Sequence, residues 1–162
     1  MGDVRKGLAA ALAGMAAAPP WHLAVASRSP ATSVSTLDLR LQGRVHWLGG
    51  LDDVTPAYYA ADLLLQPTIC DSFGLVVAEA MACGLPPIVT RSAGISELIH
   101  HQRSGWIANT ATAGDVAGAL QALGDPAARR KMGDAARTTA LRRGWDVVAA
   151  ETLAVYERAF SQ

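Results

Sequence analysis

The sequence has little of what marks several common classes of protein. It contains two cysteines in 162 residues, far from the disulfide frameworks of small secreted domains. Basic and acidic residues balance at 14 each, so no overall field attracts nucleic acid or an anionic membrane. No run reaches the roughly 18 to 20 strongly apolar residues of a transmembrane helix. We therefore expect a cytoplasmic protein without a transmembrane segment or a nucleic-acid partner.

The cysteines and histidines do not indicate a metal site. Cys70 and Cys83 lack metal-ligand spacing, and we interpret them as small core residues. None of the four histidines has a nucleophile or a ligand partner at a recognisable spacing. No Asp-x-Asp sequence is present, and we expect the protein to work without a metal.

The N-terminal segment imitates a secretory signal peptide. Arg5 and Lys6 precede the apolar run GLAAALAGMAAA, and small residues follow it. Because alanine supplies little hydrophobicity, we interpret the run as a helix over residues 5–18, capped by Asp3 and ended by a proline pair. The two cations then lie at the positive end of the helix dipole. They are unfavourable there unless they bind an anion together with the free N–H groups.

Half of the residues are apolar, enough for one buried core, and we expect a single domain over residues 1–162 with a helical part over 112–162. Short apolar runs alternate with segments that favour helices. Strands are predicted over residues 21–27, 45–48, 62–66, 87–90 and 105–108. Helices are predicted over residues 5–18, 35–41, 53–61, 73–81 and 95–101, and from 112 onward with breaks near 124–126 and 144–145.

This alternation predicts a doubly wound α/β domain. Apolar strands that do not alternate between apolar and polar residues are typical of a parallel sheet that helices cover on both faces. Ligands of such sheets bind beyond the carboxyl ends of the strands. The loops at those ends are residues 27–30, 49–53, 67–73 and 90–94.

The segment PTICDSFGLVVAEAMACGLPP contains a carboxylate pair that suggests chemistry. Asp71 lies in the loop, and Glu79 lies in the following helix with apolar or small residues on both sides. A buried carboxylate costs several kcal/mol unless it is paired or hydrogen-bonded, and ligand hydroxyls would satisfy it. At the helix start, the N–H groups of Phe73, Gly74 and Leu75 lack intrahelical partners and can hold a polar ligand. Alternatively, Asp71 caps the helix and Glu79 faces solvent.

The longer segment PTICDSFGLVVAEAMACGLPPIVTRSAGISELI resembles the retaining GT-B glycosyltransferases that carry an E-x7-E motif. Asp71 stands at the first Glu position and Glu79 at the second. The resemblance implies that Glu79 holds the ribose hydroxyls of a nucleotide-sugar donor. It implies that Asp71 and the N–H groups of residues 73 to 75 face the transferred sugar. Asp is one methylene shorter than Glu, which shortens its reach by roughly 1.5 Å.

Two further segments carry the resemblance. Arg5-Lys6-Gly7-Leu8 is similar to the family's helix start, whose lysine grips the donor diphosphate. Gly94, with Ala93 and Glu97, is similar to the family's Gly-Gly-x-x-Glu turn, with alanine in place of one glycine. The resemblance thus implies that Lys6, Asp71 and Glu79 are catalytic, and that Arg5 and Gly94 join them in donor binding.

The resemblance implies the C-terminal, donor-binding half of a GT-B enzyme that transfers a hexose-like sugar from a UDP or GDP donor. It implies no metal and no prosthetic group. The acceptor would bind through an N-terminal domain or a partner chain, so we expect this chain alone to bind donor without turnover. A peripheral association of the whole enzyme with a membrane stays open. Two alternatives are a GT-B epimerase of UDP-N-acetylhexosamines and a non-catalytic subunit that binds a partner.

One strand of the family is not found in the sequence. In the family a strand with a Gly-Arg pair precedes the lysine and lies at the centre of the sheet, and here no such strand precedes Lys6. We expect its two neighbours to have unpaired edges. A fragment, a split gene product or a partner chain would each account for this.

Overall fold

The structure is a computed structural model that describes residues 6–18, 20–28 and 38–161. The strands are β1 (Leu23–Ala26), β2 (Val45–Gly49), β3 (Leu64–Gln66), β4 (Pro87–Thr90) and β5 (Trp106–Ala108). The α-helices are α1 (Leu8–Ala17), α2 (Thr55–Ala60), α3 (Leu75–Ala82), α4 (Ala113–Ala122), α5 (Pro126–Leu141) and α6 (Trp145–Phe160). Two 3-10 helices are η3 (Leu39–Leu41) and η4 (Gly94–Leu98).

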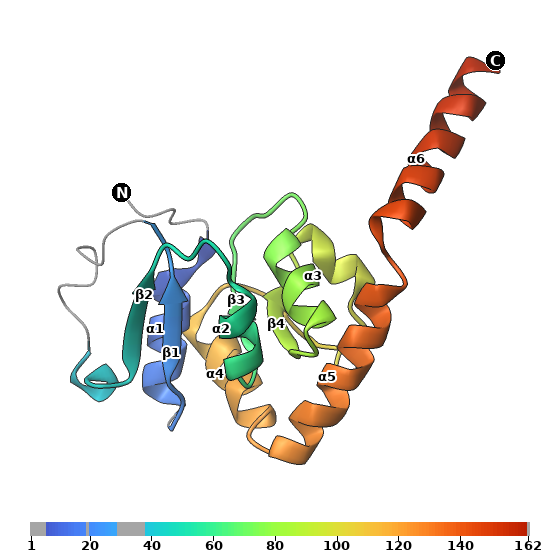
Figure 1. Ribbon diagram of the computed structural model, residues 1–162. Coiled ribbons are helices and arrows are strands. Elements are labelled where there is room, and N and C mark those ends of the chain that lie inside the picture. The colour runs from blue at the N-terminus through green and yellow to red at the C-terminus, as the bar shows by residue number, and fades with distance from the viewer. Residues whose placement is uncertain (1–5, 19, 29–37, 162) are drawn as a thin grey trace.

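All strand pairs in the described part of the chain are parallel, as the sequence predicts. β1 pairs with β2, and β3, β4 and β5 pair in that order to form a second sheet. Helices α1 and α4 lie together on one face of the strands, and α2, α3 and α5 lie on the other (Figure 1). The structure confirms an α/β fold with parallel strands between helical layers.

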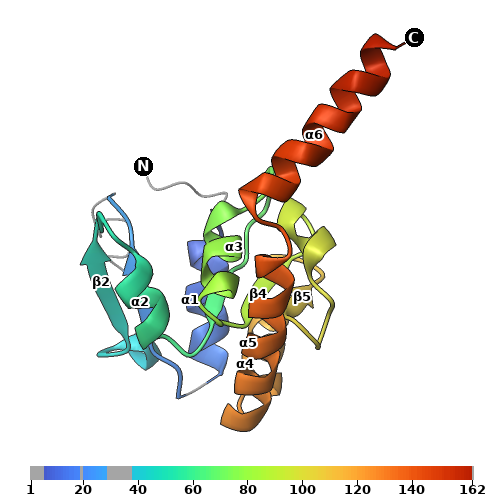
Figure 2. The same cartoon turned by 45° about the vertical axis from the view of Figure 1, so that its right-hand side comes forward.

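The core has a part on each face of the strands. One cluster joins α1 and α4 to the strands and includes Met15, Ile88, Val116 and Leu120. The other joins α3 and α5 to β4 through Val77, Met81, Val89 and Ala136. Figure 2 shows α5 crossing beside α3 and β4.

The prediction that every strand is buried on both faces is wrong for β1 and β2. β4 is buried along its length, but residues of β1 and β2 alternate between half-buried and exposed, and His46 and Leu48 are exposed. The reason lies in the helices. Leu23 and Val45 pack toward α1, whereas no described helix covers the opposite face of these two strands.

The two sheets are not joined within the described residues. β1 is hydrogen-bonded only to β2, and β3 only to β4, so each has one free edge. This agrees with the expectation that two strands have unpaired edges.

Several helices begin later than the sequence predicts. α1 begins at Leu8, after Gly7 in the left-handed conformation with φ of 73°, so Lys6 precedes the helix. The expected cap, Asp3, lies outside the described residues. α3 begins at Leu75 instead of Phe73, because Gly74 also adopts a left-handed conformation, with φ of 101°. The predicted helix over 95–101 is the shorter 3-10 helix η4.

Helix α6 projects from the rest of the molecule (Figure 1). None of its residues is buried, and its aromatic residues Trp145, Tyr156 and Phe160 are exposed. Among the described residues, no helix combines the length and the apolar character needed to cross a membrane.

Candidate functional site

The site begins where α1 meets the carboxyl end of β3. A Cβ atom on Gly7 would lie 1.7 Å from the carbonyl oxygen of Pro67. Only glycine allows this approach, and its positive φ of 73° is also a conformation that suits glycine. The contact places Lys6, immediately before Gly7, beside the loop that follows β3.

Lys6 and Asp71 form an ion pair in this loop. Lys6 Nζ donates to Asp71 Oδ2 at 2.6 Å. The Lys6 side chain is 52% exposed and the Asp71 side chain 12%. The Lys6 ammonium, helped by the Phe73 N–H, holds the pKa of the Asp71 carboxyl below its usual range. An ammonium has three donors, so Lys6 can bind a further anion while it holds Asp71.

Asp71 also shapes the entrance to α3. Its Oδ1 accepts from the Phe73 N–H at 3.4 Å, the local turn that Asp favours. Its backbone carbonyl accepts from the Gly94 N–H at 3.0 Å. A Cβ on Gly94 would lie 2.3 Å from the Ser72 carbonyl oxygen, so a glycine at this position lets the loops after β3 and β4 lie side by side.

The expected row of free N–H groups is shorter than predicted. The Phe73 N–H is occupied by Asp71, whereas the N–H groups of Gly74 and Leu75 have no hydrogen-bond partner among the described residues. Leu75 and Phe73 have exposed side chains. The start of α3 therefore presents two donors at the carboxyl edge of β3 and β4.

The prediction that Glu79 is buried is wrong. Glu79 is exposed, because it lies on the side of α3 that faces away from the core residues Val77 and Ala80. Its Oε2 accepts from the hydroxyl of Tyr58 at 3.0 Å. Solvent exposure was one of the alternatives, and it leaves the carboxylate accessible to a ligand.

Tyr58 was not predicted as a site residue. Its ring is buried with Ala80 and Leu85, and its hydroxyl donates toward Glu79 and the Val76 carbonyl. Burial, and then the hydrogen bond to Glu79, raise the pKa of Tyr58. The hydroxyl stays a donor and orients Glu79. The sequence of α2 offered no signal for this contact.

A buried hydroxyl network joins the two loops. Thr68 and Thr90 are fully buried, and the Thr90 hydroxyl donates to the Thr68 carbonyl. Ser92 Oγ donates to the same carbonyl at 3.0 Å. Thr68 Oγ1 donates to the Cys70 carbonyl at 3.0 Å. These bonds fix the segments that lead to Asp71 and to Gly94.

The structure brings Lys6, Asp71, Phe73, Gly74 and Gly94 together in one loop cluster. Leu75 follows Gly74 directly as the first residue of α3, and Glu79 lies about one turn further along the helix. Arg5 lies outside the described residues, so its predicted role stays a prediction.

The interpretation of the cysteines as core residues fails for Cys70. It is exposed in the loop before Asp71, whereas Cys83 is half-buried beside the Tyr58 cluster. The described residues hold no group of three or more His, Cys, Asp and Glu side chains that could bind a metal.

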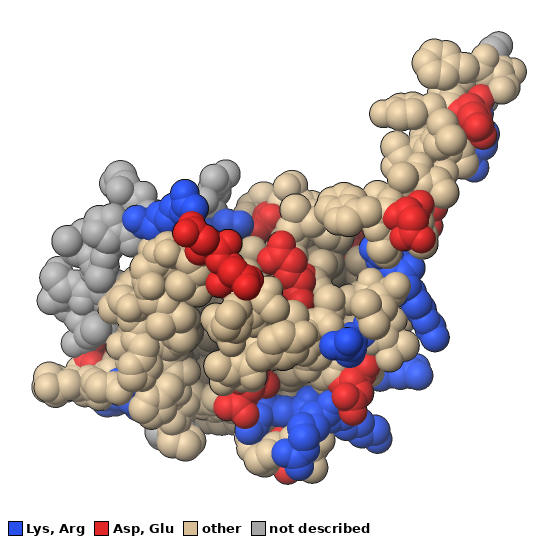
Figure 3. Space-filling view, in the orientation of Figure 1, with Lys and Arg blue, Asp and Glu red and all other residues tan. Residues whose placement is uncertain are grey.

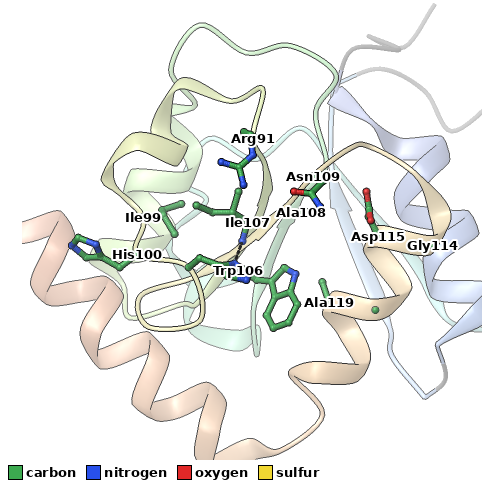
Figure 4. Close-up of a pocket in the computed structure, with 12 residues that line it drawn as sticks. Arg91, Ile99, His100, Trp106, Ile107, Ala108, Asn109, Gly114, Asp115 and Ala119 are labelled. Atoms are coloured by element: carbon green, nitrogen blue, oxygen red, sulfur yellow. Dashed lines mark hydrogen bonds between the residues drawn. The ribbon is translucent and has the colours of Figure 1, made fainter.

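A separate hollow of about 530 Å³ lies on the outer side of β5. Figure 4 shows Arg91 and Asn109 at one end and Trp106 at the other. The Ile107 N–H donates to His101 Nδ1 at 3.0 Å at this hollow. None of the predicted site residues lines it, and none of the described buried side-chain polar atoms lacks a partner. Nothing in it indicates a ligand.

Basic side chains gather on one part of the surface. In Figure 3, Lys and Arg side chains gather over α5, which carries Arg129, Arg130, Lys131 and Arg137. Arg137 donates to the Ala82 carbonyl at the end of α3 at 3.0 Å. This basic side chain thus holds α3 in place.

The model of the family "Glycosyl transferases group 1" matches residues 5–125, about three quarters of the sequence. The chain therefore belongs to this family. The matched region contains Lys6, Asp71, Glu79 and Gly94.

The chain is similar to two curated proteins, of which one is named a glycosyltransferase and the other a synthase. The chain is 45% identical over 103 residues to D-inositol 3-phosphate glycosyltransferase of Pseudarthrobacter chlorophenolicus, a match that covers 63% of this chain and 24% of that protein. It is 42% identical over 101 residues to N-acetyl-alpha-D-glucosaminyl L-malate synthase of Bacillus anthracis, covering 62% and 26%. The chain thus spans about a quarter of the length of these relatives.

A solved structure has the same fold. HepE of Anabaena in complex with UDP superposes with a TM-score of 0.83 at 21% identity, over 97% of this chain and 46% of that one. The likeness supports the expected fold, the C-terminal half of a GT-B protein, and includes most of the C-terminal helical region.

Proposed function

We propose that this chain is the nucleotide-sugar-binding domain of a glycosyltransferase. The observation that carries the proposal is the Lys6–Asp71 pair at the carboxyl edge of parallel strands, beside the free N–H groups at the start of α3. This edge is where ligands of doubly wound folds bind. An ammonium with donors to spare beside a helix N-terminus suits a diphosphate.

Each site residue has a proposed role. Lys6 binds the donor diphosphate and stabilises it as the leaving group, and Arg5 assists. The N–H groups of Gly74 and Leu75, with Asp71, face the transferred sugar, and Phe73 and Gly94 shape this part of the site. Glu79, oriented by the Tyr58 hydroxyl, accepts hydrogen bonds from the ribose hydroxyls.

The proposed reaction transfers a hexose-like sugar with retention and without a metal. The bond between the sugar and the diphosphate breaks with its electron pair leaving on the phosphate oxygen, where Lys6 and the helix N–H groups stabilise the charge. The acceptor hydroxyl attacks the sugar carbon from the same face, its oxygen forms the new glycosidic bond, and its proton passes to the departing phosphate oxygen. Lys6 supplies the positive charge that a metal supplies in other sites.

The donor is proposed to be a UDP or GDP sugar, and UDP is favoured because HepE, which shares this fold, forms a complex with UDP. The acceptor stays open, since relatives similar over this region are named for inositol 3-phosphate and for malate. Acceptor binding, and hence turnover, is proposed to need a further domain or a partner chain.

Calorimetric titration of the full chain with UDP-glucose, UDP-N-acetylglucosamine and GDP-mannose tests the proposal. We expect binding of at least one donor and loss of that binding in Glu79→Ala. The matched control is Glu157→Ala, which removes an exposed glutamate of α6 that has no side-chain partner among the described residues. Absence of binding at millimolar donor would contradict the proposal.

A further inference from the structure

Two histidines meet on the exposed face of β1 and β2. His46 of β2 lies opposite Ala24 of β1, and His22 comes two residues before Ala24. Because successive side chains of a strand point to opposite faces, His22 and His46 lie on the same face. Both side chains are exposed there, since no described helix covers this face.

The ring nitrogens of the two histidines are in direct contact. His22 Nδ1 lies 3.0 Å from His46 Nε2. The ring planes are 9° from parallel, and the ring centroids are 5.4 Å apart. A proton between the two nitrogens makes this contact a hydrogen bond, with one ring as donor and the other as acceptor. Two adjacent imidazole nitrogens are also a pair of metal ligands, because neutral imidazole is the commonest metal ligand in proteins.

The separation of the two nitrogens indicates which metals fit. At a metal–nitrogen distance of about 2.0–2.1 Å, two ligands at a right angle are about 2.9 Å apart, and two at the tetrahedral angle about 3.3 Å. The observed 3.0 Å is closer to the right angle. Ligands at right angles are typical of the square-planar and tetragonal sites of Cu²⁺ and Ni²⁺. Mg²⁺ and Ca²⁺ prefer oxygen ligands.

Water would complete the coordination of such an ion. The described residues contain no group of three or more His, Cys, Asp and Glu side chains that could bind a metal, so the described ligands are the two imidazoles. Because both side chains are exposed, water reaches the remaining positions. The exposed rings can also turn until both lone pairs point at the ion.

The positive charge of Arg44, two residues before His46, is directed elsewhere. Its guanidinium donates to the carbonyls of Arg40 at 2.8 Å, Trp21 at 3.2 Å and Met15 of α1 at 3.4 Å. Helix α1 packs on the other face of β1 and β2, so these bonds hold the guanidinium toward that side.

We propose that His22 Nδ1 and His46 Nε2 together bind one Cu²⁺ or Ni²⁺ ion, with water at its other positions. Each ring then carries its proton on the nitrogen that is not bound to the ion. The ion joins the starts of β1 and β2, which stabilises the fold by closing a loop between positions 24 apart. The site lies near the amino ends of these strands, whereas the proposed donor site lies at the carboxyl edge. The two proposals are therefore tested separately.

Calorimetric titration of the full chain, free of any histidine tag, with NiCl₂ tests the proposal. We expect one Ni²⁺ per chain and at least tenfold weaker binding in His22→Gln and in His46→Gln. Ni²⁺ should raise the temperature of unfolding of the unchanged chain and not that of either variant. The electron paramagnetic resonance spectrum of the unchanged chain with Cu²⁺ should be tetragonal, with hyperfine splitting from two nitrogens.

The matched controls are His100→Gln and Cys70→Ser, which change two other exposed side chains that could bind a metal. Neither should alter the affinity for Ni²⁺. Binding that survives in both His22→Gln and His46→Gln, or no binding at millimolar Ni²⁺, would overturn the proposal. One ion per two chains would overturn it in favour of a dimer bridged by the metal. Splitting from a single nitrogen in the Cu²⁺ spectrum would overturn it independently of any variant.

Discussion

Lys6 Nζ lies 2.6 Å from Asp71 Oδ2, although 65 positions separate the two residues in the sequence. The pair joins the segment before α1 to the loop after β3, so a cation and a helix N-terminus meet at one edge of the strands. Neither segment alone would bring these two groups together.

Lys6→Met should weaken donor binding about 10- to 100-fold, because charge-assisted hydrogen bonds are worth about 1.5–3 kcal/mol. The matched control is Lys131→Met, which removes an exposed lysine of α5. Calorimetry with the best-binding donor measures the affinity of each variant. Equal affinities for the two variants would show that Lys6 does not contact the donor.

Asp71→Asn should lower the free energy of unfolding at pH 7 by at most about 1 kcal/mol, since half of the Lys6 side chain is exposed and solvent weakens the pair. Folding lowers the pKa of Asp71 from its ordinary value of 3.8. The stabilisation is therefore fully present above that value and is lost as the pH falls through the lower pKa of the folded state. Urea unfolding of both proteins between pH 7 and pH 2.5 measures the difference. A difference that grows on acidification would reverse the predicted sign.

Gly94→Ala should lower the free energy of unfolding by about 1–3 kcal/mol. The added Cβ would lie 2.3 Å from the Ser72 carbonyl oxygen, so the two loops must separate. Gly118→Ala is the matched control. Its Cβ would have no neighbour within 4 Å inside α4, and we expect about 0.5–1 kcal/mol of stabilisation. Thermal and urea unfolding give both values. If Gly94→Ala and Gly118→Ala changed the free energy of unfolding in the same direction, the close contact between the two loops would be contradicted.

Tyr58→Phe should reduce donor affinity a few-fold and destabilise the fold by about 1 kcal/mol, because it removes the hydroxyl that donates to Glu79 at 3.0 Å. Tyr59→Phe, at an exposed ring, should change neither quantity. Calorimetry and urea unfolding separate the two effects. An unchanged affinity with lowered stability would mean that Tyr58 serves packing alone.

Ending the chain after Gly144 should change the free energy of unfolding of the remaining domain by less than about 1 kcal/mol. α6 has no buried residue, and its described side-chain contact with the body is the exposed Arg143–Glu151 pair at 2.7 Å. Urea unfolding of the shortened and full chains measures this. A loss of several kcal/mol would show that α6 packs on the domain in solution.

The order and type of most elements could be predicted because each strand is a short apolar run and most helices are bounded by glycine or proline. The start of α3 was predicted two residues early, because Gly74 adopts a left-handed conformation and the carbonyl of Phe73 accepts a hydrogen bond from the N–H of Ile95, which is distant in sequence. The half-exposed faces of β1 and β2 were missed for a related reason. Apolar composition suggests burial, but burial depends on which helices reach the strand.

The predicted site residues lie close together where local sequence determines them, as for Asp71, Phe73 and Gly74. The exposure of Glu79 could not be predicted from its neighbours in the sequence. Val77, Ala78 and Ala80 surround it in sequence, yet the helical turn directs Glu79 outward while Val77 and Ala80 point inward. Tyr58 lies 21 residues away, beyond the reach of any local pattern.

The buried hydroxyls of Thr68 and Thr90, with Ser92, have a consequence for the thermodynamics of binding. Since they tie together the segments that lead from β3 to Asp71 and from β4 to Gly94, these segments lose their conformational entropy when the chain folds. A ligand at this edge then orders little additional backbone on binding. Its association should show the small entropic penalty of a preorganised receptor.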